Sequence, residues 1–275
     1  ARKAGPPIEE QNFMSSTLQA NNHMEAYVNT HTVNGLTTIE FYHPAQNSMP
    51  GQQLARLREA ILEAGKNEDT LVILLKSAGD RSFCAGASFT ELAAIRDLES
   101  SKTFFMGFAS VINAIRVCGK LVIGRIHGKA VGGGVGLASA CDYTFATQHA
   151  AVRLSELAVG IGPFVIGPAV ERKVGNAAFC QMAITPEVWQ SAAWALQKGL
   201  YQEVFETSEA MDAAISAMAD KLLSYHPAAL HDLKTVFWQG TQNWDQLLTE
   251  RAAISGRLLL SDFSRNAIDG FLAKS

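Results

Sequence analysis

Two glycine-containing loops carry residue types that could do chemistry. The first, FCAGASF, covers residues 83–89, and the second, GKAVGGGVGLASACD, covers residues 128–142. Glycine costs conformational entropy, so three consecutive glycines indicate unusual backbone angles or the close approach of another group to the backbone. Peptide N–H groups at the start of a helix stabilise negative charge on a ligand oxygen. The loops therefore predict an anion hole made of backbone N–H groups.

Other interpretations of the glycines are weaker. The sequence around them contains no G-x-x-x-x-G-K-[S/T] motif, its spacing does not fit G-x-G-x-x-G, and the G-x-S-x-G turn of serine hydrolases is absent. A strand-to-helix turn without further function is the alternative that stays open.

Alternating strand-like and helix-like segments must position these loops. Residues 36–42, 71–76 and 121–126 have the composition of strands, while residues 51–66 and 99–117 have the apolar periodicity of helices. Strands that alternate with helices favour an α/β fold with a largely parallel sheet. Both loops would then emerge at the same carboxyl edge, where ligands bind, and an N–H group from each could converge on one oxygen.

The chain as a whole predicts three parts. We expect a flexible N-terminal extension over residues 1–25, an α/β core over residues 26–206 and a helical region over residues 207–275. The helices of the last region are short and amphipathic, so we expect them to pack on neighbouring surfaces.

Composition narrows the function classes. The 275 residues are 48% hydrophobic and 18% charged, as in ordinary globular proteins, and the net charge of −3 gives no reason to expect nucleic acid or a membrane as a partner. The four cysteines are too few and too widely spaced for a disulfide scaffold, and they form no zinc-binding cluster with histidine. We therefore expect a cytoplasmic protein with reduced thiols and no metal.

The sequence resembles the crotonase, or enoyl-CoA hydratase/isomerase, superfamily from about residue 26 to the carboxyl terminus. The resemblance is carried, in this order, by SFCAGASF, IHGKAVGGGVGLASACDYTFAT, RLSELAVGIGP and DFSRNAIDGFLAK. It implies a crotonase-like ββα spiral core with a helical C-terminal region that serves in oligomerisation, as a homotrimer or homohexamer. It also implies an acyl-CoA thioester substrate and no separate cofactor, since coenzyme A is part of the substrate.

The resemblance also implies site residues. It places two oxyanion donors on the backbone N–H groups of Ala87 and Gly133, and donors of this kind stabilise a transition state by about 3–4 kcal/mol each. Further substrate contacts are expected from Ala85, Gly86, Gly134, Gly136, Pro163, Phe164, Phe271 and Lys274.

One of the two glutamates that hydratases of this superfamily use is missing. The first falls on Gly136, and the second is retained as Glu156. A carboxylate beside an apolar acyl pocket has a raised pKa, which suits proton exchange with carbon. The alternative for Glu156 is a solvated glutamate that stabilises the start of a helix.

Three functions follow from this pattern. A single base can serve both steps of a 1,3 double-bond shift, which favours a Δ3–Δ2 enoyl-CoA isomerase. GGGVGL followed by LSELAVGIGP resembles the bacterial methylglutaconyl-CoA hydratase branch instead, which favours addition of water to an α,β-unsaturated acyl-CoA and is the interpretation we prefer. The third is an acyl-CoA-binding protein that has lost its chemistry.

We also make predictions for several individual residues. Phe164 stands where related hydratases have a glycine whose N–H helps to hold the attacking water, and we expect the N–H of Phe164 to keep that contact. His127 and Asp142 are expected to be structural, with hydrogen bonds to the adjacent turn and to nearby backbone, respectively. Arg265 and Lys274 are weak candidates for contact with the CoA phosphates.

Overall fold

The computed structural model describes residues 25–273 and is built around a six-stranded sheet. In spatial order the strands are β1 (Tyr27–Val33), β2 (Leu36–Tyr42), β3 (Val72–Ser77), β5 (Leu121–Ile126), β7 (Tyr143–Thr147) and β9 (Glu203–Phe205). Strands β1 and β2 form an antiparallel hairpin, and every other neighbouring pair in this sheet is parallel. The α/β class predicted from the sequence is therefore confirmed.

A second, smaller sheet holds the glycine loops. It consists of β4 (Ser82–Cys84), β6 (Lys129–Val131) and β8 (Val152–Arg153), all parallel. The loops follow β4 and β6, not the longer apolar strands of the main sheet as we expected. The two loops still emerge at one edge, because the parallel strands β4 and β6 have their carboxyl ends on the same side.

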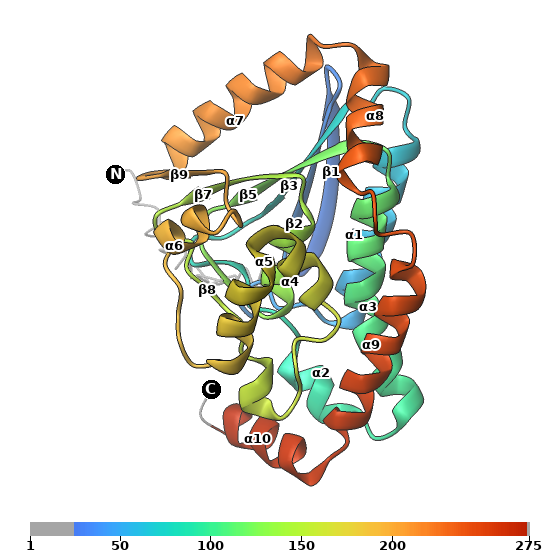
Figure 1. Ribbon diagram of the computed structural model, residues 1–275, viewed down its shortest axis with the longest axis vertical. Helices are drawn as coiled ribbons and strands as arrows, with labels where there is room; N and C mark the ends of the chain where they lie inside the picture. The colour runs from blue at the N-terminus through green and yellow to red at the C-terminus, as the bar shows by residue number, and fades with distance from the viewer. Residues whose placement is uncertain (1–24, 274–275) are drawn as a thin grey trace, which may run out of the picture.

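Helices cover both faces of the main sheet (Figure 1). They are α1 (Gly51–Lys66), α2 (Phe89–Ala94), α3 (Leu98–Val117), α4 (Gly133–Ala140), α5 (Gly167–Ile184), α6 (Ala192–Gln197), α7 (Ser208–Leu223), α8 (Pro227–Phe237), α9 (Trp244–Leu259) and α10 (Asp262–Leu272), with a short 3₁₀ helix, η1 (Glu156–Val159).

The alternation of side chains along β3 shows how the sheet is buried on two sides. Val72 and Leu74 belong to an apolar cluster that includes Met211 of α7, whereas Ile73 and Leu75 belong to the main core on the other face. Successive side chains of a strand point to opposite faces, so a strand covered on both faces is apolar throughout.

The C-terminal helices are part of the same body as the core. Helix α9 lies along α3 (Figure 1), and α10 packs on α2 and η1. A Cβ at Gly256 of α9 would lie 3.0 Å from the backbone nitrogen of Lys102, so glycine permits this close contact. The Ser101 hydroxyl of α3 donates to the Gly256 carbonyl at 2.9 Å, which fixes the register of the two helices.

Some expectations lie outside the structure. Residues 1–24 of the predicted extension, and Lys274, are not among the described residues. The boundaries of the three predicted parts stay predictions.

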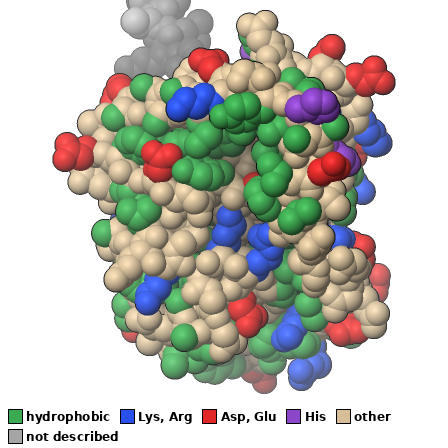
Figure 2. All heavy atoms as spheres, turned by 45° about the horizontal axis from the view of Figure 1, so that its top comes forward, with side chains coloured by type: hydrophobic (Ala, Val, Ile, Leu, Met, Phe, Trp, Pro, Cys, Tyr) green, Lys and Arg blue, Asp and Glu red, His purple; other side chains and the backbone are tan. Residues whose placement is uncertain are grey.

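The surface shows uneven charge. Figure 2 shows Lys and Arg side chains gathered in a hollow near the centre of one face, although the net charge is −3. Within residues 25–273, no helix has the length and apolar character needed to cross a membrane.

Candidate functional site

The two glycine loops meet at the start of α4. Gly86 has a φ of +86°, and a Cβ there would lie 2.7 Å from the carbonyl oxygen of Val131 and 3.5 Å from the nitrogen of Gly133. A positive φ and a contact this close both require glycine. The loop after β4 therefore packs directly on the backbone that leads into α4.

The predicted oxyanion donors are free at this junction. Gly133 is the first residue of α4, and Ala87 lies in an isolated parallel bridge with Met49. That bridge uses the carbonyl of Gly86 and the N–H of Ser88, so Ala87 does not donate to Met49. Among the described residues, neither the N–H of Ala87 nor that of Gly133 has a hydrogen-bond acceptor.

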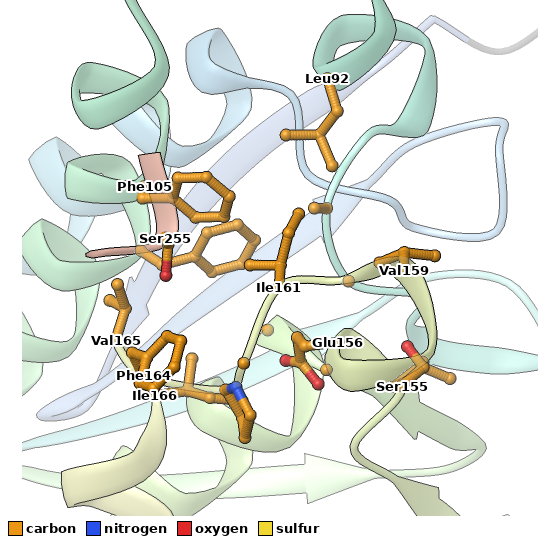
Figure 3. Close-up of a pocket in the computed structure, with 18 of the residues that line it drawn as sticks. Leu92, Phe105, Ser155, Glu156, Val159, Ile161, Phe164, Val165, Ile166 and Ser255 are labelled. Atoms are coloured by element: carbon orange, nitrogen blue, oxygen red, sulfur yellow. The ribbon is translucent and has the colours of Figure 1, made fainter. Parts of the chain in front are cut away.

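Both loops border a pocket with about 580 Å³ of atom-free space, its open mouth included (Figure 3). Seven predicted site residues line it: Ala85, Gly86, Ala87, Gly133, Glu156, Pro163 and Phe164. The other lining residues are mostly apolar: Phe89, Leu92, Phe105, Phe108, Val131, Gly132, Ser155, Val159, Ile161, Gly162, Val165, Ile166 and Ser255.

Three predicted site residues lie outside the pocket lining. Gly134 packs on β4, since a Cβ there would lie 2.4 Å from the carbonyl oxygen of Cys84. Phe271 of α10 stacks on Phe89, a lining residue, with ring centroids 4.4 Å apart. Gly136 faces Ile166 instead of the pocket.

Among the described residues that line the pocket, Glu156 alone carries a carboxyl group. It opens η1, and its carboxyl packs against Gly132, where a Cβ would lie 2.9 Å from Oε1. Oε2 is buried and has no hydrogen-bond partner among the described residues. Burial raises the pKa of Glu156 to about 7, opposed by its own backbone N–H and the charge of Arg153. These surroundings do not fit a solvated glutamate that only stabilises a helix start.

The place of the missing glutamate is filled by another side chain. A Cβ at Gly136 would lie 2.5 Å from Cγ2 of Ile166 and 2.7 Å from its Cβ. Ile166 is itself almost fully buried. The glycine therefore leaves no vacant space beside the pocket.

The prediction for the N–H of Phe164 is wrong. This N–H donates to the carbonyl of Gly162 at 2.8 Å, in a tight turn, so it is not free to hold a water. The ring folds back over Gly162, where a Cβ would lie 2.5 Å from two ring carbons, and it also lines the pocket.

Asp142 has the structural role that the sequence predicted. Asp142 accepts hydrogen bonds from the backbone N–H of Val122 at 2.7 Å, from Lys234 at 2.7 Å and from Trp238 at 2.8 Å, as a structural residue should.

The prediction that the side chain of His127 bonds the adjacent turn is wrong. Both ring nitrogens are buried without a partner among the described residues, while the backbone carbonyl of His127 accepts from Thr147 at 2.7 Å. Burial, followed by the charges of Arg125 and Lys76, lowers the pKa of His127 to about 4.

Several residues that line the pocket were not predicted from the sequence. Phe105 and Phe108 come from α3 and Phe89 from α2. The three-residue spacing of Phe105 and Phe108 places them on one helix face, a signal that also fits an ordinary core. Nothing in the sequence indicates that Ser255, on α9, lines the pocket, because its position depends on how α9 packs on α3.

Comparisons with known proteins agree on the kind of protein. A family model described as enoyl-CoA hydratase/isomerase matches residues 31–273. A short-chain-enoyl-CoA hydratase of Clostridium acetobutylicum is 29% identical over 84% of this chain and 88% of its own. A peroxisomal Delta(3,5)-Delta(2,4)-dienoyl-CoA isomerase of Arabidopsis thaliana is 27% identical over 78% of this chain and 82% of its own. In fold, the chain is similar to an enoyl-CoA hydratase from Bacillus halodurans, with a TM-score of 0.82 at 19% identity over 89% of this chain and 99% of that one.

Proposed function

Because this chain belongs to the enoyl-CoA hydratase/isomerase family, we propose that it adds water to the double bond of an α,β-unsaturated acyl-CoA. Ala87 and Gly133 donate their N–H groups to the thioester oxygen, and Glu156 is the acid and base. The carrying observation is that Glu156 borders the same pocket as these two N–H groups, and that its buried Oε2, like the two N–H groups, has no hydrogen-bond partner among the described residues. No metal or redox cofactor takes part, and coenzyme A belongs to the substrate.

A single carboxylate suffices for the proposed addition. The Glu156 carboxylate takes a proton from water as the water oxygen bonds to C3, and the electrons of the C2–C3 double bond move onto the thioester oxygen. The two N–H groups stabilise that developing charge, because they are already oriented and need no reorganisation. The Glu156 carboxyl then returns the proton to C2, and the carbonyl re-forms. A pKa of about 7 suits both transfers.

A Δ3–Δ2 enoyl-CoA isomerase is the second candidate, favoured by specific contacts. Ile166 fills the space of a second carboxylate, and the N–H of Phe164 is bonded to Gly162. A second carboxylate is therefore absent from the described residues that line the pocket, and the N–H of Phe164 is already bonded, so neither can hold the attacking water. Glu156 alone would move a proton from C2 to C4 over the same enolate.

The test is incubation of the purified protein with 2-enoyl-CoA, 3-enoyl-CoA and 3-methylglutaconyl-CoA, the specific substrate expected from the sequence, with products identified by mass. We expect a gain of one water on a 2-unsaturated thioester, lost in Glu156→Gln and kept in Glu209→Gln, a glutamate exposed on α7. A 3-enoyl thioester converted at unchanged mass, with no water added to the others, would establish the isomerase. CoA affinity without turnover of any substrate would overturn both.

The pH dependence follows from the pKa of Glu156. Hydration needs the carboxylate as the base in the first step, so kcat/KM should rise with pH through about 7 and level off above it. A profile that falls over this range would mean that Glu156 acts first as the protonated acid.

A further inference from the structure

A second cavity lies beyond Phe164. Pro163 and Phe164 line both this cavity and the pocket of Glu156. The other residues that border it are Gly167, Pro168, Glu171, Phe179, Ala183 and Arg251, around about 550 Å³ of atom-free space, its open mouth included. Pro163 and Phe164 therefore form a partition between the two spaces.

Helix α9 supplies a polar group to each side of this partition. Ser255 lines the Glu156 pocket, and Arg251, one helical turn earlier, lines the cavity beyond. Ser255 is 1% exposed, and its hydroxyl has no hydrogen-bond partner among the described residues. Figure 3 shows it on the Phe105 side of the pocket, with its oxygen directed toward Phe164 and Val165.

The charge of Arg251 is not neutralised by any described residue. The side chain is half-buried, and it makes no ion pair, hydrogen bond or aromatic stacking contact within residues 25–273. Glu171 borders the same cavity, but its carboxylate accepts from Asn176 at 2.9 Å and forms no ion pair with Arg251. A guanidinium beside the apolar Phe179 and Ala183 is suited to bind a carboxylate through two parallel hydrogen bonds.

We infer that the acyl group of the substrate extends past Phe164 and ends in a carboxylate that Arg251 binds, with the hydroxyl of Ser255 donating to an oxygen of the same carboxylate. The substrate class is then the mono-CoA thioester of an unsaturated dicarboxylic acid. Rotation of the Phe164 ring joins the two cavities when such a chain enters. The inference rests on the proposed function, because it concerns the acyl group of the same thioester.

The sites of thioester and carboxylate recognition are separate in this arrangement. Ala87, Gly133 and Glu156 act at the thioester end, while Arg251 contacts only the far end of the chain. Removal of the Arg251 charge should therefore weaken binding of dicarboxylic thioesters and should not weaken binding of hydrocarbon ones.

The test measures binding of saturated thioesters by calorimetry, so that it does not depend on turnover. Glutaryl-CoA and its longer dicarboxylic homologues are each compared with a hydrocarbon acyl-CoA in which an isopropyl group replaces the terminal carboxylate. We expect tighter binding of the dicarboxylic member at one chain length, and a loss of about tenfold or more in Arg251→Met. Arg257→Met, an exposed arginine on the same helix, is the matched control.

The outcomes separate this inference from the proposed function. Equal affinities for both members at every length, or a preference that Arg251→Met leaves intact, overturn the inference even if the protein hydrates hydrocarbon enoyl-CoA. A dicarboxylic preference that depends on Arg251 supports the inference even if no thioester is hydrated. Ser255→Ala should weaken dicarboxylic binding alone, whereas Ser255→Thr, which keeps a hydroxyl, should retain more of it.

Discussion

At the scale of single residues, the site has exchanged a carboxylate for an apolar contact. Gly136 lets Ile166 pack where a longer side chain would otherwise project, and Glu156 is left as the only carboxylate among the described residues that line the pocket. A second buried carboxylate would also raise the pKa of the first by repulsion. The apolar replacement thus sets both the shape of the pocket and the protonation of Glu156.

This exchange predicts that the missing glutamate cannot be restored alone. Gly136→Glu places a Cβ 2.5 Å from Cγ2 of Ile166, so we expect a loss of about 1–3 kcal/mol in the free energy of unfolding and no gain in hydration. Combination with Ile166→Ala, which removes the clashing atoms, should cost less than the sum of the two single changes. Urea denaturation and hydratase kcat measure both effects, and strictly additive costs would contradict the clash.

Sequence reasoning reached the pocket at this scale where short contiguous motifs carry the resemblance to the superfamily. Gly86, Gly133 and Glu156 each lie in such a motif and line the pocket, while their predicted parts in substrate binding and catalysis stay predictions. Ser255 and Arg251 could not be predicted, because their meeting with Phe164 depends on how α9 packs against α3. Their types and spacing are ordinary for any amphipathic helix.

At the scale of elements, one carboxylate joins several segments. Asp142 follows the end of α4. It bonds β5 through the N–H of Val122, α8 through Lys234, and the residue after α8, Trp238, through its indole N–H. The side chains of Asp142 and Lys234 are 4% and 2% exposed, respectively. Paired charges buried this deeply leave a large penalty when one partner is removed.

Asp142→Asn should therefore destabilise the fold by about 3–5 kcal/mol, because it leaves the ammonium of Lys234 buried without a counter-charge. The matched control is Asp212→Asn, which breaks an ion pair with Arg125 in which the aspartate is 51% exposed. Such a pair contributes about 1 kcal/mol or less. Urea denaturation compares the two, and equal losses would mean that burial of the Asp142 pair has no special effect. Adding Lys234→Met to Asp142→Asn should recover stability.

The longer elements were predictable and the shorter ones were not. The helix expected over residues 51–66 matches α1, and the strand expected over residues 121–126 matches β5, because each shows a sustained apolar pattern. Strands β4 and β6, of three residues each, are too short for any period to show. Their pairing places the two loops at one edge. The prediction of a common edge was therefore right, whereas the strands predicted to precede the loops were wrong.

At the scale of the whole molecule, the C-terminal helices complete the pocket from within the same chain. Ser255 of α9 lines the pocket, and Phe271 of α10 stacks on a residue that lines it. Residues 207–275 were predicted to be helical from their periodicity, but the surface on which they pack is a long-range property. Their predicted part in oligomerisation stays a prediction.

Assembly is the property that the exposed apolar surface makes testable. Ile184, Val188 and Leu196, between the end of α5 and α6, are 71%, 50% and 41% exposed. Exposed apolar side chains are common at protein interfaces, and a second copy of the chain would remove these three from water. We expect light scattering to give the mass of a homotrimer or homohexamer, and Ile184→Asp with Val188→Asp to lower that mass. A monomeric wild-type protein would contradict the expectation, because these side chains would then stay in water. An unchanged mass in the double variant would place the contact on another face.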